Sequence, residues 1–229
     1  MTGLIAAAAA FVLLHLLVSG TRVRDALTGA IGQGPYMGLF SLASVGLLAW
    51  LIFAFGAARG AADAVFWGAT TATRWIQFVL QLIAFLLVVI GLVTPNPTSV
   101  RQEGTLQRPN AVRGILRITR HPFLWGVAIW AAGHLLVNGD LAGIVLFASM
   151  GVLAILGTIS IDAKRKRALG TAWDTFAGHT SNVPFAAVAA GRQKVSLAEI
   201  GWWRIALAIV LWAGVLAIHR YAFGLSPLP

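Results

Sequence analysis

Six long apolar runs that carry almost no charged residues constrain this chain more than any other feature. A helix of about 17 to 25 apolar residues, which rises about 1.5 Å per residue, is long enough to cross a bilayer. The runs do not alternate polar and apolar residues, which does not fit the strands of a membrane barrel. We expect an all-α integral membrane protein, a bundle of six transmembrane helices in one domain over residues 1–229. The expected spans are residues 3–19, 36–56, 75–94, 122–138, 141–161 and 200–219.

The composition excludes soluble, disordered and disulfide-rich classes. Apolar residues make up 59% of the chain, charged residues 10%, and the mean hydropathy is +0.83. A soluble domain carries about 25% charged residues, and a disordered chain has fewer apolar ones. The absence of cysteine also excludes thiol chemistry and thiolate metal ligands.

The net charge of +10, from 17 basic and 7 acidic residues, is explained by topology. With six spans, the loops that follow the first, third and fifth spans share one face, and 14 of the 17 basic residues fall there; the others are Arg59, Arg74 and Arg220. Basic loops stay cytoplasmic, which predicts a bacterial inner membrane protein with both termini on the non-cytoplasmic side. Because this charge meets anionic headgroups, we expect the lipid bilayer as partner, with an apolar small-molecule substrate, and no nucleic acid.

Two histidines, His15 and His134, lie inside expected spans, where an ionisable side chain suggests a function. On a helix, His134 shares a face with Gly126, Trp130 and Asn138. A histidine on a face with glycine and an aromatic ring suits a flat haem, which needs close backbone approach and an imidazole ligand for its iron. Alternatively, each imidazole bonds a carbonyl of a neighbouring helix.

A second constellation precedes the fourth span. Arg113, Arg117 and Arg120 are spaced i, i+4 and i+7, so an interfacial helix would place them on one basic face. Such a face can bind carboxylates or phosphates, as in haem propionates or a nucleoside cofactor, or it can anchor the chain to headgroups. His121 follows directly, and Pro122 suits the first turn of the span.

Three local contacts are expected. Asp162 follows the fifth span on the same face as these arginines, so it is placed to pair with one of them. The turn at residues 138–140, Asn-Gly-Asp, predicts that the fourth and fifth spans form an antiparallel pair. Gln77 and Gln81 of the third span share a face, which lines a polar pocket or bonds to another helix.

The chain resembles the NnrU family of bacterial membrane proteins. The resemblance rests on His15-Leu16-Leu17, Val23-Arg24, residues 36–42, 113–122, 124–126, 134–136 and 138–140, Asp162 and residues 180–185. It covers nearly the whole chain, and the block from Arg113 to Asp140 is the most specific part. The family is named for a link to nitrite and nitric oxide reduction.

The NnrU family is similar to zeta-carotene isomerase, a membrane haem b enzyme that isomerises a carotenoid double bond. This similarity implies haem b bound by His15 and His134. The isomerase has a cysteine three residues before the second histidine, where this chain has Ala131, so a switch to a thiolate ligand is excluded. Measured from the cytoplasmic ends of their spans, His15 is about 6 Å deep and His134 about 18 Å, so His121 is a reserve ligand for the iron.

Two further classes remain. The residues Arg120, His121, Pro122, Asp162 and Pro184 resemble, over a shorter match, the isoprenylcysteine methyltransferases, which bind S-adenosylmethionine at the cytoplasmic face. That resemblance implies a membrane methyltransferase. The third class is a non-enzymatic protein for membrane assembly or regulation.

Overall fold

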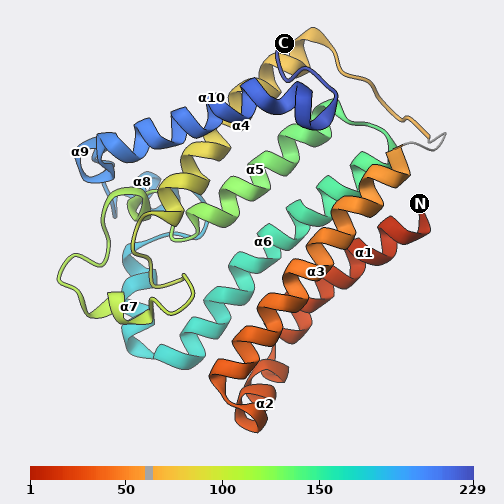
Figure 1. Ribbon diagram of the computed structural model, residues 1–229. Coiled ribbons are helices and arrows are strands. Elements are labelled where there is room, and N and C mark those ends of the chain that lie inside the picture. The colour runs from red at the N-terminus through yellow and green to blue at the C-terminus, as the bar shows by residue number, and fades with distance from the viewer. Residues whose placement is uncertain (60–63) are drawn as a thin grey trace.

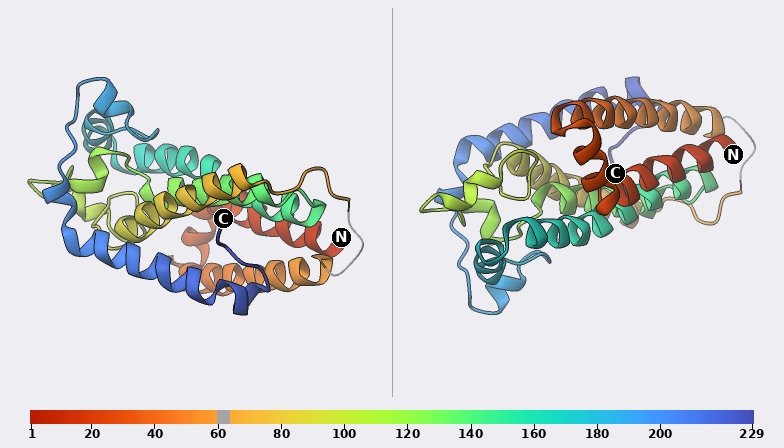
Figure 2. Two further views of the ribbon diagram at one scale, coloured as in Figure 1. Left: turned by 90° about the horizontal axis from the view of Figure 1, so that it is seen from above. Right: turned by 90° about the horizontal axis from the view of Figure 1, so that it is seen from below.

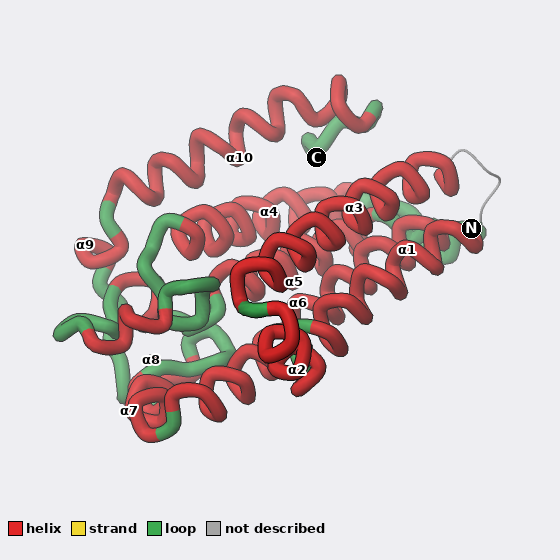
Figure 3. Tube along the Cα trace, turned by 60° about the horizontal axis from the view of Figure 1, so that its bottom comes forward, coloured by secondary structure: helices red, strands yellow, loops and turns green. Residues whose placement is uncertain are grey.

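The computed structural model is a bundle of helices, and it describes residues 1–59 and 64–229. The long helices lie side by side, and the short ones gather with the loops around α7, α8 and α9 (Figures 1 and 3). Within the described ranges no strand forms beyond one isolated bridge between Val65 and Asp140. The helices are α1 (Thr2–Leu13), the π-helix η1 (Leu14–Val18), α2 (Arg22–Ile31), α3 (Gln33–Arg59), α4 (Thr71–Leu92), the 3-10 turns η2 (Glu103–Gln107) and η3 (Gly114–Arg117), α5 (Pro122–Val137), α6 (Leu141–Leu169), α7 (Thr171–His179), α8 (Ala186–Ala189), α9 (Leu197–Ile200) and α10 (Trp202–Phe223).

The long helices pack in a row. The pair α4 and α5 forms the centre, α6 packs against α5, α10 packs against α4, and α1 and α3 pack against each other and against α6. Figure 2 shows α6 and α10 at opposite sides of this row. Small residues allow the close approach of α1, where Ala7 and Ala8 pack with Leu51 of α3 and Ala142 of α6.

The chain is a multi-pass membrane protein, but the expected count of six spans is not reached. Among the described residues, four helices are long and apolar enough to cross a membrane: α3, α4, α6 and α10. The segment Thr2–Val18 qualifies together with α2 as a pair bent by 77°. Helix α5 has only 16 residues and is shorter than these four helices. The side of the membrane on which each terminus lies stays a prediction.

Helices occur at all six apolar runs, and the main difference in bounds is at α6. It continues to Leu169, beyond the expected end at residue 161, because Ala, Lys and Arg favour a helix even outside the apolar layer. Gly170, with φ +53, ends it. The predicted turn is confirmed, since α5 ends at Val137 and the Asp140 side chain caps α6 by accepting from the Gly143 N–H at 2.8 Å.

The fold brings the basic loops together. Figure 1 places α2, α7, α8 and α9 toward one end of the bundle, and the N-terminus and the turn between α5 and α6 at the other. Helix α1 runs toward the basic end, whereas α5 begins there and runs away from it. This opposite direction decides how far apart the two intramembrane histidines lie.

Candidate functional site

A buried polar cluster lies where α5 begins. Asp162 of α6 accepts a hydrogen bond from Arg120 Nε, with Oδ1 at 2.9 Å, and its Oδ1 lies 2.6 Å from His121 Nε2. The Arg120 guanidinium bonds Asp162 through a second nitrogen as well, and Asn182 Nδ2 donates to Oδ2 at 3.1 Å. The predicted pair between Asp162 and an arginine before α5 is thus confirmed, with Arg120 as its partner.

Local backbone geometry holds this cluster in place. Pro122 occupies the first turn of α5, where its missing N–H needs no partner, and it packs against Gly91 of α4 so closely that a Cβ there would meet its ring at 2.9 Å. The Arg120 N–H donates to the Ser181 carbonyl at 2.9 Å. The Arg120 carbonyl accepts from Asn96 Nδ2 and from a threonine hydroxyl, both at 3.0 Å. Three loops therefore meet at one residue.

His121 is a buried imidazole with a fixed orientation. It is 2% exposed, and burial lowers its pKa, an effect that the hydrogen bond to Asp162 partly offsets. Because a carboxylate can only accept, Nε2 donates its proton to Asp162. Two cavities at this end, of about 430 and 230 Å³, are lined by other residues. The hydrogen bonds of the cluster therefore attach the loops to the helix bundle.

The prediction that one interfacial helix places Arg113, Arg117 and Arg120 on a single basic face is wrong. Only Gly114–Arg117 is helical, as a single 3-10 turn, because Gly114 (φ +55) turns the chain tightly against the backbone of Glu199. Arg117 instead bonds Glu199, with Nε at 2.7 Å from Oε2, and Arg120 faces Asp162. Both guanidinium groups are thus occupied by carboxylates of this chain, whereas Arg113 is exposed. The apolar residues Ile115, Leu116 and Ile118 of the same segment are buried.

His15 lies in the π-helix η1, at the end of α1. Its Nδ1 donates to the Phe11 carbonyl at 2.8 Å, and its ring contacts the rings of Phe11 and Phe40, with centroids at 4.4 and 5.3 Å. Within the described residues, Nε2 makes no hydrogen bond. A π-turn widens the helix and often accompanies a functional residue. The position of His15 in it is therefore a structural reason to test this residue.

His134 lies near the opposite end of α5. Its Nδ1 donates to the Trp130 carbonyl at 2.9 Å, and its ring stacks on Phe147 of α6 with centroids at 4.7 Å. The predicted face is occupied by a neighbouring helix, because a Cβ at Gly126 would lie 2.6 Å from Val88 of α4. Gln81 Nε2 also bonds the Trp130 carbonyl at 3.3 Å. Of the two readings for the glutamines, the bond between helices is therefore the one observed.

The two histidines do not face one iron. His134 is level with Phe147 of α6, whereas the Gly20 carbonyl, after His15, accepts a hydrogen bond from Ser160 of α6 at 3.5 Å. Phe147 and Ser160 are about 20 Å apart along α6, and His15 lies roughly one and a half turns before Gly20, so about 12 Å separates the two histidines in depth. The residues present therefore do not fit one haem held by both imidazoles, and His121, the reserve ligand, has its Nε2 on Asp162.

The residues that the methyltransferase resemblance names lie together in the structure, but their charged groups bond to one another. Arg120 and His121 both bond Asp162, and the carboxylate also accepts from Asn182. No charged group of this set is left unpaired for a nucleoside cofactor. In the structure these residues attach the loops to the helix bundle.

The sequence interpretation missed the role of rare acids. The chain has seven acidic residues, and each of the six described ones has a defined partner. Glu103 pairs with the buried Arg165 of α6, and Glu199 pairs with Arg117. The Arg117 hydrogen bond lowers the pKa of Glu199. In a chain with so few acids, an acid in a basic loop predicts an ion pair, and this signal was available.

The family model described as NnrU protein matches residues 3–227. The 15-cis-zeta-carotene isomerase, chloroplastic, of Zea mays is 37% identical over 84 residues, which is 36% of this chain and 22% of that protein. The Arabidopsis thaliana protein of the same description is 35% identical over 82 residues, 35% of this chain and 22% of that protein. The matches thus span 22% of each relative's length, and no solved structure matches.

Proposed function

We propose that this chain, which belongs to the NnrU protein family, isomerises a carbon–carbon double bond of a carotenoid-like polyene within the membrane. The observation that carries the proposal is the 37% identity over 84 residues to a protein described as 15-cis-zeta-carotene isomerase. Isomerisation removes and adds no atom, so it needs a protein that binds an apolar chain and lets one double bond rotate. The chemistry requires a membrane site and no water-filled active site.

The surface of the bundle is suited to a substrate dissolved in lipid. Helix α3 exposes large apolar side chains along its length, among them Leu42 at 73% and Phe53 at 77% exposure. A polyene in the hydrocarbon layer reaches such a surface without leaving the lipid. The proposed substrate therefore enters from the lipid and needs no polar entry channel.

Haem b is a second part of the proposal and rests on family resemblance. His15 and His134 each keep Nδ1 on a backbone carbonyl, so each has a lone pair on Nε2 for a metal. Haem would supply redox chemistry at iron, but the two imidazoles are too far apart along the bundle to share it. Resemblance also extends the proposal to a bacterial inner membrane and to nitrite or nitric oxide metabolism.

The isomerase proposal is tested in a bacterial host that accumulates 15-cis-zeta-carotene. Chromatography of extracted pigment should show that expression of this chain in the dark lowers the fraction of the 15-cis isomer. An unchanged isomer ratio, with the protein present in the membrane fraction, contradicts the proposal and favours a non-enzymatic role.

Haem is tested separately by the absorption spectrum of detergent-purified protein after haem-replete expression. A Soret band that His15→Ala or His134→Ala removes supports ligation by that histidine. His179→Ala is the matched control, since this histidine is exposed on α7. Absence of the band in the wild-type protein, or an equal band in all three variants, refutes ligation at His15 and His134.

A further inference from the structure

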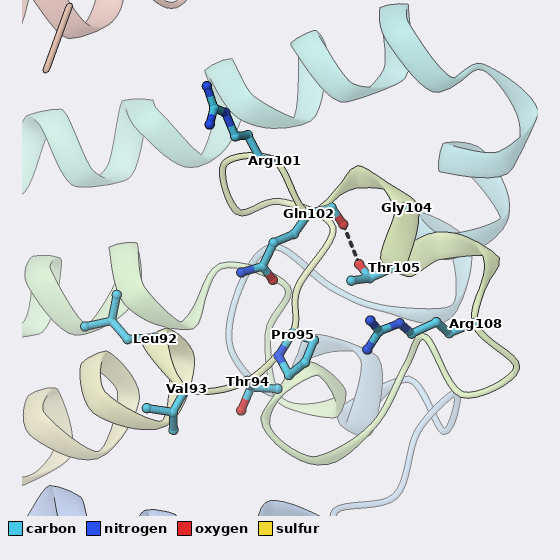
Figure 4. A pocket seen from close by; sticks show the side chains of 9 residues that line it. All are labelled: Leu92, Val93, Thr94, Pro95, Arg101, Gln102, Gly104, Thr105 and Arg108. Carbon is cyan, nitrogen blue, oxygen red and sulfur yellow. Dashed lines mark hydrogen bonds between the residues drawn. The ribbon is translucent and has the colours of Figure 1, made fainter. Parts of the chain in front are cut away.

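A cavity of about 430 Å³ lies between the C-terminal end of α4 and the loop of residues 93–108 (Figure 4). Its apolar wall consists of Leu92, Val93 and Pro95, and its polar wall includes Arg101, Gln102 and Arg108. In Figure 4 the Arg108 guanidinium points toward Pro95, whereas the Arg101 side chain points away from Pro95 and Arg108. Thr94, Gly104 and Thr105 complete the lining.

The charged and amide groups of this wall are hydrogen-bond donors without partners. Within the described part of the chain, the side chains of Arg101 and Arg108 make no hydrogen bond or ion pair, although nearby acids pair with other bases. The Gln102 Oε1 accepts from the Asn96 N–H at 2.8 Å, so its amide nitrogen keeps two free donors. The lining contains no carboxylate. Such a wall attracts an anion.

The charge balance supports this reading. The C-terminal end of α4 contributes about half a negative charge, whereas two guanidinium groups contribute two positive charges. Guanidinium groups bind phosphate oxygens in pairs of parallel hydrogen bonds. The positive charge at the cavity is therefore larger than the partial negative charge of the helix end.

The loop is held in place on both sides of Arg101. Before it, the buried Arg165 of α6 donates to the Ser99 carbonyl at 2.7 Å; after it, Arg165 pairs with Glu103. Arg101 has φ +60, a conformation that a residue with a side chain rarely adopts and that persists where surrounding contacts determine it. The cavity is thus formed without a ligand, which lowers the entropy cost of binding.

The cavity lies where a spanning helix leaves the apolar layer. Leu92, the last residue of α4, is 63% exposed, and Val100 in the same loop is 66% exposed. Apolar side chains at the rim and arginines at the wall match an amphiphile with an acyl part and a phosphate. We propose that this cavity binds a phosphate oxyanion, with Gln102 and Arg108 as donors and Arg101 as a further positive charge on the same loop, and that this phosphate belongs to the headgroup of an acidic phospholipid.

The test uses the full chain in nanodiscs of phosphatidylcholine with about 20% phosphatidylglycerol, compared with phosphatidylcholine alone. Native mass spectrometry measures how many acidic lipids stay bound. Replacing both arginines, Arg101→Gln with Arg108→Gln, should lower the affinity for phosphatidylglycerol by about tenfold, the loss of charge-assisted bonds. The control is Arg22→Gln with Arg167→Gln, two exposed basic residues at the same end of the bundle, with the same change in charge.

Inorganic phosphate, titrated in nanodiscs of phosphatidylcholine alone, distinguishes the sources. Retention of phosphatidylglycerol by the wild type and the control, lost in the cavity variant, supports a lipid headgroup. Saturable stabilisation by inorganic phosphate that the cavity variant loses, with no retained lipid, keeps the phosphate site and overturns the lipid as its source. If the cavity variant and the control bind both probes equally, the proposal is wrong. Circular dichroism checks that both variants are folded.

Discussion

Replacing Asp162 by Asn should destabilise the bundle more than any surface change of the same kind. The carboxylate accepts from Arg120, His121 and Asn182, and the side chains of Arg120 and Asp162 are only 12% and 19% exposed. Removing one partner of a buried ion pair costs about 3 to 5 kcal/mol, and the residual exposure places this pair at the lower end, about 3 kcal/mol. For a chain of this size, that is a fall of about 6 to 12 °C in the unfolding midpoint.

The assay is thermal unfolding of purified protein in detergent, followed by circular dichroism. Asp174→Asn is the matched control, because Asp174 forms an ion pair with Lys166 at 3.4 Å whose side chains are 53% and 68% exposed. Such a pair contributes less than about 1 kcal/mol. If Asp162→Asn lowers the midpoint no more than Asp174→Asn does, the cluster at the start of α5 does not hold the loops as described.

Two further changes test the packing and the protonation of the same region. Gly126→Ala should lower the free energy of unfolding by about 2 kcal/mol, because the added Cβ would lie 2.6 Å from Val88 and 2.9 Å from the Ala84 carbonyl. Gly151→Ala is the control and should be tolerated, since its Cβ would lie 3.5 Å from Ala131. Equal unfolding midpoints for the two variants would contradict the close contact of α4 and α5. The lowered pKa of buried His121, which faces Asp162 and Arg120, means that the unfolded chain binds its proton first. Stability should therefore be full above about pH 6.5 and fall as the pH drops below it, with a smaller fall in His121→Gln; parallel profiles would exclude this residue as the cause.

The positions of the helices could be predicted because length and polarity decide where a chain can lie in lipid. The run at residues 122–138 became α5 almost to the residue, and Asn138, Gly139 and Asp140 gave the turn. The number of spans could not be predicted from apolar runs alone. A run of 16 residues makes a helix packed in the bundle without reaching the length of its neighbours, and the bend after α1 depends on tertiary packing.

The candidate site was less predictable, because spacing on an assumed helix misplaced the arginines. The segment of residues 113–121 forms only one 3-10 turn, and its bonds reach residues 41 to 85 positions later in the chain, such as Asp162 and Glu199. Long-range pairing of this kind leaves no periodic pattern. The two histidines within apolar runs stand out in the sequence, but their relative depth depends on helix directions that only the fold supplies.

The central claim is tested most directly with purified protein in liposomes that contain 15-cis-zeta-carotene, kept in the dark and sampled over time by chromatography. If this chain is an isomerase, the 15-cis isomer should decrease and the product isomer should increase by the same amount, with no change in total pigment. A 15-cis fraction that stays equal to that of protein-free liposomes, with folded protein present and haem supplied during expression, would contradict it.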